Sequence, residues 1–211
     1  MTKTGHEALD GLVLAGGKSS RFGSDKASAL LRGRSLLQWV VSALEPACER
    51  IVIVRARGQQ LPEVSSVAQL VVVDDRYEAK GPLAGLATGF PAVTSELCFA
   101  TACDTPLVRR ELVDLLTRAA PGYDVICPMV NALHQPLTAV YRPGACLPVF
   151  EESIEKDLLR IVPAFERLAT RIVSEDEVRV ADPELDSFRN ANRPERLAEI
   201  EAILASREAP V

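Results

Sequence analysis

The stretch from Gly16 to Lys26 combines two adjacent glycines with three cations. Gly16 and Gly17 directly follow a short apolar run, and Lys18, Arg21 and Lys26 come soon afterwards. Glycines let the backbone approach a ligand closely and turn its N–H groups inward. A helix that follows such a loop adds a positive N-terminus, and the cationic side chains neutralise the remaining negative charge. This pattern predicts a phosphate-binding loop.

The spacing of these glycines excludes two common phosphate-binding motifs. A Walker A loop needs the pattern GxxxxGK[ST], and a dinucleotide-binding turn needs GxGxxG, whereas Gly16 and Gly17 are adjacent. A plain strand-to-helix turn would explain the glycines, but it would leave the three clustered cations unexplained.

Carboxylates follow two other apolar runs. Asp104 comes after the run Leu97–Ala102, and Asp74 and Asp75 close the run Leu70–Val73. A carboxylate at a strand end suits Mg²⁺, which proteins hold with one or two carboxylates plus substrate phosphates. The alternative for Asp104 is an N-cap of the next helix. Asp75 suits the N–H donors of a guanine base, and the alternative for both Asp74 and Asp75 is a turn or capping role.

Two amides flank one small residue near the end of the chain. In an extended segment Asn190 and Asn192 point to the same side, because side chains alternate along a strand. Together they suit a phosphate, or a metal held through water. The alternative is that they cap the last helix.

The elements that must position these residues alternate between strand and helix. This alternation predicts a doubly wound α/β sheet, in which ligands bind at the carboxyl ends of the strands. All the residues above except the amide pair then fall on that edge. Strands are expected at Leu12–Ala15, Arg50–Arg55, Leu70–Val73, Leu97–Ala102 and Tyr123–Met129, and helices at Ser35–Leu44, Gly81–Val93 and Arg109–Ala120. The apolar runs in the second and third of these strands suit parallel strands covered on both faces, and Ser35 suits the N-cap of the first helix.

The second half of the sequence is less regular. Its apolar spacing predicts the strand Pro136–Tyr141, the helices Cys146–Glu152 and Lys156–Leu168, short strands at Arg171–Val173 and Val178–Val180, and a last helix at Pro194–Leu204. Because Pro163 lacks a backbone N–H, it is expected to bend or restart the second of these helices.

Composition bounds the class of protein. The chain has 211 residues, 47% of them hydrophobic, which fits one compact domain. The formal net charge of −5 and the lack of a basic run argue against a nucleic-acid partner. The polar N-terminus resembles no signal peptide and no apolar run is long enough for a membrane helix, so we expect a cytoplasmic protein without a membrane partner. Five unpaired cysteines without a CxxC pair are expected to be buried thiols.

The segment from Leu14 to Lys26 closely resembles the signature loop of the molybdenum cofactor guanylyltransferases, which belong to the Rossmann-like nucleotidyltransferases. Further family motifs follow in the expected order at Gly81–Leu86, Cys103–Pro106, Gln135–Tyr141 and Asn190–Glu195. The resemblance implies a three-layer αβα fold with a mostly parallel central sheet. It also implies a single domain over residues 1–211, with a nucleotide-binding half at about residues 10–130 and an acceptor-binding half at about residues 131–205.

The resemblance further implies a reaction. The terminal phosphate of Mo-molybdopterin attacks the α-phosphorus of GTP, pyrophosphate leaves, and molybdopterin guanine dinucleotide forms. The implied catalytic residues are Lys26, Arg21 and Asp104, with Asp104 as the Mg²⁺ ligand. The implied binding residues are Leu14, Ala15, Gly16, Gly17, Lys18, Lys26, Asp75, Asp104, Asn190 and Asn192.

One departure and two alternatives stay open. Arg55 stands where the family often has Asn, so the nucleotide contact of that Asn is in doubt here. A sister enzyme that transfers CMP to molybdopterin, or a nucleotide to a sugar phosphate, would carry a similar loop. A non-catalytic nucleotide-binding protein of the same fold is the other alternative. Molybdoenzymes or cofactor-delivery proteins are candidate protein partners of the guanylyltransferase.

Overall fold

The computed structural model describes residues 8–16 and 26–208 of the chain. Its strands are β1 (Leu9–Leu14), β2 (Leu30–Leu31), β3 (Arg34–Ser35), β4 (Arg50–Arg55), β5 (Gln69–Asp74), β6 (Leu97–Ala102), β7 (Val125–Val130), β8 (Leu133–His134), β9 (Thr138–Tyr141) and β10 (Thr170–Val173). Its α-helices are α1 (Leu36–Leu44), α2 (Gly81–Gly89), α3 (Arg110–Arg118), α4 (Pro143–Glu155), α5 (Ile161–Ala164), α6 (Glu175–Ala181) and α7 (Pro194–Glu208). Short 3₁₀ turns lie at Lys26–Ser28, Phe90–Ala92, Phe165–Arg167 and Asp186–Phe188.

The central sheet has the strand order β10-β7-β9-β6-β1-β4-β5, and β8 pairs with β7. The strands β6, β1, β4 and β5 are parallel, as are β10 and β7. The strand β9 runs antiparallel to both of its neighbours. The mostly parallel sheet and the strands expected from the apolar runs are therefore confirmed.

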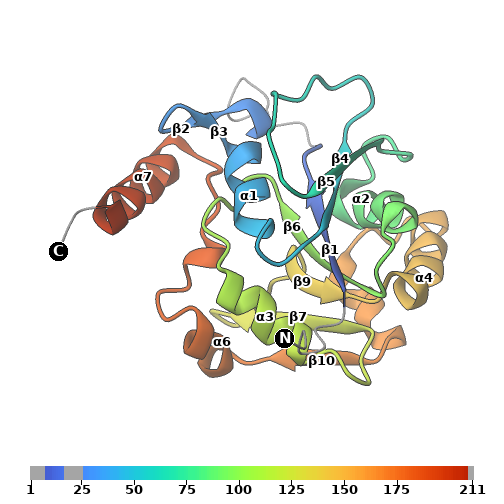
Figure 1. Cartoon of the computed structure of the whole chain (residues 1–211). Helices are drawn as coiled ribbons and strands as arrows, with labels where there is room; N and C mark the ends of the chain where they lie inside the picture. The colour runs from blue at the N-terminus through green and yellow to red at the C-terminus, as the bar shows by residue number, and fades with distance from the viewer. Residues whose placement is uncertain (1–7, 17–25, 209–211) are drawn as a thin grey trace, which may run out of the picture.

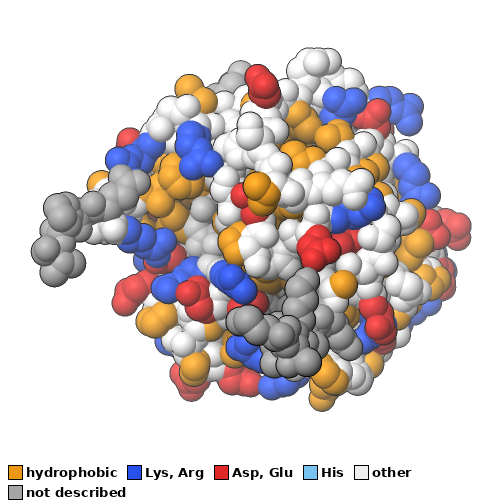
Figure 2. All heavy atoms as spheres, viewed as in Figure 1, with side chains coloured by type: hydrophobic (Ala, Val, Ile, Leu, Met, Phe, Trp, Pro, Cys, Tyr) orange, Lys and Arg blue, Asp and Glu red, His pale blue; other side chains and the backbone are white. Residues whose placement is uncertain are grey.

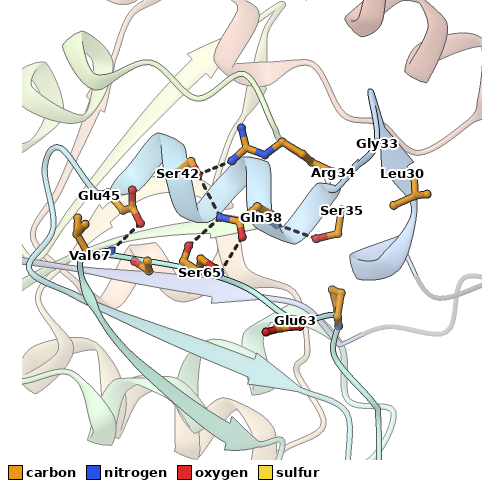
Figure 3. Close-up of a pocket in the computed structure, with 12 residues that line it drawn as sticks. Leu30, Gly33, Arg34, Ser35, Gln38, Ser42, Glu45, Glu63, Ser65 and Val67 are labelled. Carbon is orange, nitrogen blue, oxygen red and sulfur yellow. Dashed lines mark hydrogen bonds between the residues drawn. The ribbon is translucent and has the colours of Figure 1, made fainter.

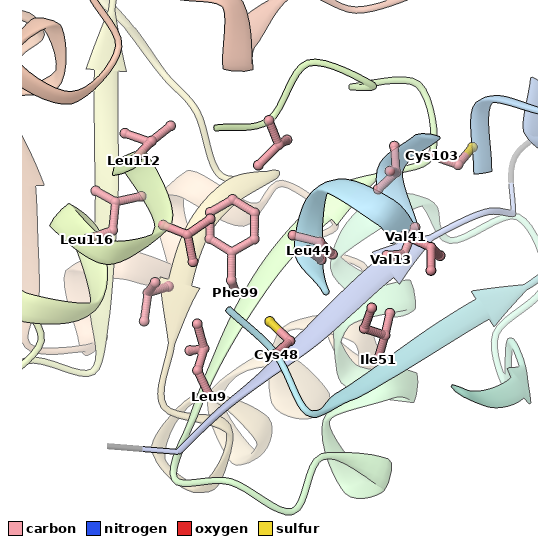
Figure 4. Close-up of a cluster of buried hydrophobic side chains, with 14 of the residues drawn as sticks. Leu9, Val13, Val41, Leu44, Cys48, Ile51, Phe99, Cys103, Leu112 and Leu116 are labelled. Atoms are coloured by element: carbon pink, nitrogen blue, oxygen red, sulfur yellow. The ribbon is translucent and has the colours of Figure 1, made fainter. Parts of the chain in front are cut away.

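Helices cover both faces of this sheet, as Figure 1 shows, and form the outer layers of a three-layer αβα fold. On one face α1, α3 and α6 bury Val41, Leu116 and Val178 against the sheet. Figure 4 shows part of this cluster, in which Val13, Ile51 and Phe99 of three neighbouring strands face the helices. On the other face α2, α4 and α5 pack against strand residues of opposite parity, because side chains alternate along a strand.

A third, smaller cluster joins the last helix of the described chain to the β2–β3 hairpin. Ile200 and Leu204 of α7 pack with Leu31 of the β2–β3 hairpin, with Leu36 and with Leu107. In Figure 1 α7 accordingly lies beside the hairpin, at the side of the sheet. The Trp39 indole donates a hydrogen bond of 2.8 Å to the Leu31 carbonyl, which fastens the hairpin to α1.

The first helix begins as its sequence predicts. Ser35 is the N-cap of α1, and its hydroxyl accepts a hydrogen bond of 3.2 Å from the Gln38 amide. The helix ends at Leu44, before Pro46.

Three expectations of local structure were wrong. The segment Val178–Val180 belongs to α6, because Ser174 and Glu177 form a capping box that starts a helix there. The helix expected at Lys156–Leu168 begins only at Ile161, since the chain turns at Asp157 with φ of 57°. The strand β5 is not covered on both faces: it lies at the sheet edge, and Val72 is 48% exposed.

Charge is mixed on one face of the molecule. On the face that Figure 2 shows, Lys and Arg side chains are interspersed with Asp and Glu. Within the described residues, no helix has both the length and the apolar character needed to cross a membrane.

Candidate active site

Four parallel strands bring their carboxyl ends to one edge of the sheet. From β1 the chain continues to β4 and β5 on one side, and it then crosses to β6 on the other side of β1. In open α/β sheets the crevice for a ligand lies at such a switch point, beyond the carboxyl ends of the strands. Here that point lies between the loops that follow β1 and β6.

Lys26 and Asp104 meet at this switch point. The Lys26 Nζ atom lies 2.9 Å from the Asp104 Oδ2 atom, and the Asp104 side chain is only 11% exposed. Asp104 does not cap the following helix, because α3 begins at Arg110 with Arg109 as its N-cap. The capping alternative for Asp104 was therefore wrong, and its carboxylate faces a cation from the first loop.

The amide pair near the end of the chain is docked beside Asp104. The backbone N–H of Ala191, which is fully buried, donates a hydrogen bond of 2.7 Å to the Asp104 carbonyl. Asn190 is exposed and Asn192 half-buried on either side of this anchor. The structure thus brings two amide side chains from the far end of the sequence to the same edge as the Lys26–Asp104 pair.

The end of β1 is fixed by neighbouring loops. The N–H groups of Ala15 and Gly16 both donate to the Val54 carbonyl, at 2.8 and 3.2 Å, and the Leu14 carbonyl accepts from the Cys103 N–H at 3.0 Å. A Cβ atom on Gly16 would lie 2.8 Å from the backbone nitrogen of Ala56, so only glycine allows this approach of the two loops.

Gly17, Lys18 and Arg21 lie outside the described residues. Their expected roles stay predictions from the sequence.

Asp75 takes part in the turn after β5. Its Oδ1 atom accepts hydrogen bonds from the Tyr77 N–H at 3.0 Å and from the Thr88 hydroxyl at 2.9 Å. Its backbone N–H donates to the Arg55 carbonyl at 2.7 Å. Among the described residues its Oδ2 atom accepts no hydrogen bond.

Asp74 and Arg55 pair with each other across β4 and β5. The Arg55 Nε atom lies 2.7 Å from the Asp74 Oδ1 atom. The guanidinium of Arg55 is thus bound to the neighbouring strand. In this respect Arg55 is no simple substitute for the Asn that the family often has at this position.

The helix α2 starts at the same edge because its glycines fit against β1. A Cβ atom on Gly85 would lie 3.1 Å from a Leu14 methyl carbon, and one on Gly89 would lie 2.3 Å from a Leu12 methyl carbon. The helix thus runs from the carboxyl end of β1 back toward its amino end. Its last turn contacts the segment after β5, through the hydrogen bond from the Thr88 hydroxyl to Asp75.

Two polar side chains at this edge were missed by the sequence patterns. Thr88 is buried inside the apolar helix α2, and a hydroxyl in such a helix signals a need for a hydrogen-bond partner. Gln59 lies in an irregular loop after β4, where no periodicity or motif distinguishes it.

A separate cavity of about 700 Å³ lies on the outer side of α1 and includes none of the residues predicted to act. Figure 3 shows that Gln38 reaches across it to Ser65. The side-chain amide of Gln38 donates to the Ser65 carbonyl at 2.8 Å through Nε2 and accepts from the Ser65 N–H at 2.8 Å through Oε1. These bonds fix the loop to the helix, so the lining residues serve the fold.

The cysteines are buried with free thiols, as expected. Burial raises the pKa of the Cys48, Cys127 and Cys146 thiols to about 12. Burial likewise raises the pKa of Cys98 well above its ordinary value. A thiol that stays protonated is a poor nucleophile, so these four do not supply one at neutral pH.

Known sequences and structures share this architecture. The molybdenum cofactor guanylyltransferase of Desulfosudis oleivorans is 32% identical over 94% of this chain and 96% of its own length. A probable molybdenum cofactor guanylyltransferase of Bacillus licheniformis is 33% identical over 90% of this chain and 95% of its own.

Among solved structures, the molybdopterin-guanine dinucleotide biosynthesis protein A of Archaeoglobus fulgidus superposes with a TM-score of 0.76 at 26% identity, covering 93% of this chain and 99% of that one. The 2-C-methyl-D-erythritol 4-phosphate cytidylyltransferase of Thermus thermophilus shares the fold. It superposes with a TM-score of 0.69 at 16% identity, and the match covers 92% of this chain and 98% of that one. The sequence model of the MobA-like NTP transferase domain family matches residues 11–170 of this chain. The chain therefore belongs to the MobA-like NTP transferase family, together with the molybdenum cofactor guanylyltransferases.

Proposed function

We propose that this chain transfers GMP from GTP to the terminal phosphate of Mo-molybdopterin. The observation that carries this proposal is the Lys26–Asp104 pair at the switch point of the sheet, 2.9 Å apart, with the Asn190–Asn192 segment docked on the Asp104 backbone. The names of the curated relatives support guanylyl transfer to the molybdenum cofactor.

The reaction needs alignment and charge neutralisation more than covalent help. An oxygen of the acceptor phosphate forms a bond to the α-phosphorus of GTP, and the bond from that phosphorus to the pyrophosphate oxygen breaks. The attacking phosphate is already ionised, so no general base is required. Lys26 would bind the α-phosphate, and the cations Lys18 and Arg21 of the same loop would neutralise the leaving pyrophosphate.

Asp104 fits a role as the protein ligand of Mg²⁺. Its carboxylate is a hard oxygen donor, and Mg²⁺ is held by one or two carboxylates plus substrate phosphates. When bound, Mg²⁺ neutralises charge on the phosphates. The amide oxygens of Asn190 and Asn192 lie on the segment anchored to Asp104 and suit water-mediated contacts with the same group.

The nucleotide and the acceptor occupy opposite sides of β6 in this proposal. The loops after β1, β4 and β5, at Leu14 to Gly16 and at Asp75, would take the GTP. The strands β9, β7 and β10 lie on the other side and would shape the acceptor pocket. Asp104, at the end of β6, then stands at the boundary where the two substrates react.

Pyrophosphate release with molybdopterin and each of the four nucleoside triphosphates tests the proposal. We expect release with GTP and Mg²⁺, and we expect it to fall strongly in K26A. Release with CTP instead would assign the chain to a sister transferase. Nucleotide binding without any release would favour a non-catalytic protein and contradict the proposal.

A further inference from the structure

We propose that Gln59 is a positioning residue of the nucleotide site, where it holds the Ala15–Gly16 peptide in place through its side-chain amide. The inference rests on the proposed function, because that peptide opens the loop assigned to the triphosphate. Gln59 itself need not touch the nucleotide.

The Gln59 amide bridges two loops at the reactive edge of the sheet. Its Oε1 atom accepts a hydrogen bond of 2.8 Å from the Ala56 N–H, and its Nε2 atom donates one of 3.1 Å to the Ala15 carbonyl. An amide oxygen accepts hydrogen bonds and an amide nitrogen donates them. Both bonds therefore require the same orientation of the side-chain amide, with Oε1 toward the Ala56 N–H and Nε2 toward the Ala15 carbonyl.

The backbone of Gln59 is held as well. Its N–H donates to the Ala56 carbonyl at 3.0 Å, which closes a tight turn. The Arg55 Nη1 atom donates to the Gln59 carbonyl at 3.2 Å, while the Nε atom of the same guanidinium is bound to Asp74. The side chain that grips β1 is therefore carried by a turn that is fixed to β4 and β5.

Both polar groups of the Ala15–Gly16 peptide are thus occupied. The Gly16 N–H donates to the Val54 carbonyl at 3.2 Å, and the Ala15 carbonyl accepts from Gln59 at 3.1 Å. With both groups hydrogen-bonded, the Ala15–Gly16 peptide cannot rotate freely. A phosphate cradle binds tightly only if its backbone is set before the ligand arrives, because ordering it on binding costs affinity.

Two substitutions at Gln59 test this role, each with a control at its exposed neighbour. Q59E keeps the shape and the acceptor for Ala56 but places a carboxylate against the Ala15 carbonyl, and Q59M removes both hydrogen bonds. Q60E and Q60M make the same changes at the exposed Gln60. The probe is GTP with Mg²⁺, measured by calorimetric titration and by the KM and kcat of pyrophosphate release.

We expect both Gln59 variants to raise the Kd and the KM for GTP by about tenfold or more, as loss of one hydrogen bond or a new repulsion would do. The kcat at saturating GTP and the thermal midpoint should change much less. Damage to folding alone would lower the active fraction, and so kcat, without moving KM.

The Q59E variant adds a pH signature. A protonated carboxyl can donate to the Ala15 carbonyl, so the Q59E defect should shrink as pH falls from about 8 to about 5. The Q59M defect should keep its size over that range.

Equal Kd and KM for GTP in the Gln59 variants and the Gln60 controls would overturn the inference. If wild-type protein fails to bind GTP, the proposed function itself fails, so the two outcomes are distinguishable. If one Gln59 variant does not fold, the comparison is made with the other.

Discussion

The Lys26–Asp104 ion pair joins a side chain that follows β1 in the sequence to one that follows β6. A solvent-exposed ion pair contributes little to stability, because solvent screens it and ordering two side chains costs entropy. The Asp104 side chain is mostly buried and the Lys26 side chain is 32% exposed, so the pair holds charge at an edge that water still reaches. In the proposed function its chemical value lies in presenting a cation and an anion together where GMP is transferred.

Replacing Asp104 with Asn should remove the charge and keep the shape. We expect D104N to lower kcat/KM for GTP by about a hundredfold or more, as loss of one electrostatic stabiliser commonly does, and to leave the urea midpoint nearly unchanged. Pyrophosphate release and urea unfolding are the measurements. D114N, at the surface Arg110–Asp114 pair of α3, is the matched control and should stay active. An active D104N enzyme would remove Asp104 from the catalytic residues.

Thr88 orients Asp75 through one hydroxyl. It donates to Asp75 Oδ1 at 2.9 Å and accepts from the Arg76 N–H at 3.2 Å. Replacing it with the isosteric Val should destabilise the fold by about 1–3 kcal/mol, because buried polar groups lose their partner. Because Asp75 Oδ1 then keeps only the hydrogen bond from the Tyr77 N–H, we also expect T88V to reduce the preference for GTP over ATP.

The T88S variant keeps the hydroxyl and serves as the control. Competition between the two nucleotides, followed by pyrophosphate release, measures the preference. Equal selectivity in T88V and T88S would show that Asp75 does not need this contact.

At the scale of elements, α2 approaches β1 so closely that only glycine fits between them. A Cβ atom on Gly89 would lie 2.3 Å from a Leu12 methyl carbon and 2.9 Å from a Val54 methyl carbon. We expect G89A to reduce the free energy of unfolding by about 1–3 kcal/mol through overpacking. In α4, Gly144 has open space around its Cβ position, so G144A should be neutral or slightly stabilising. Urea unfolding compares the two, and an unchanged G89A would mean that α2 shifts without cost.

The elements that could be predicted from the sequence are those with a strong local signal. The β-branched run Ile51–Val54 became the buried strand β4, and the spacing and N-cap of α1 were correct. The strand predicted at Val178–Val180 was wrong, because two valines in a short segment fit a strand or a helix equally well. The capping box at Ser174 starts a helix there. The expectation that β5 is covered on both faces was wrong, because an apolar run does not reveal which strand lies at the edge of a sheet.

At the scale of the whole molecule, long-range contacts complete the site, and these are what the sequence could not supply. The patterns selected Lys26, Asp104 and the Asn190–Asn192 pair separately. No local pattern showed that Ala191 would bind the Asp104 carbonyl, or that Gln59 would reach Ala15. Such contacts depend on how loops pack at the sheet edge, and loop packing has no periodicity in the sequence.

The buried thiols should make the whole fold less stable as the pH becomes alkaline. Burial raises the pKa of Cys48, Cys127 and Cys146 to about 12, with the Asp10 and Asp124 charges adding to the shift at Cys48 and Cys146. In the unfolded chain a thiol titrates at about 8.5. Between these values the folded chain keeps protons that the unfolded chain has lost, so stability falls as pH rises.

Urea unfolding between about pH 8 and about pH 11 should therefore show a steadily falling midpoint. C48A should lower the overall stability by leaving a small void, yet it should reduce the slope of the midpoint against pH, because one titrating group is gone. Equal slopes in C48A and wild type would contradict this account.

The bond from Ala191 to Asp104 also bears on synthesis of the chain. The strands from β1 to β9 are made early and can pair as they leave the ribosome, since chains fold progressively during synthesis. The segment that docks on Asp104, and the helix α7 that packs on the β2–β3 hairpin, follow these strands in the sequence and are made after them. A nascent chain can thus build most of its sheet before the edge around Asp104 is complete, and we expect activity only once the segment around Ala191 has emerged and docked.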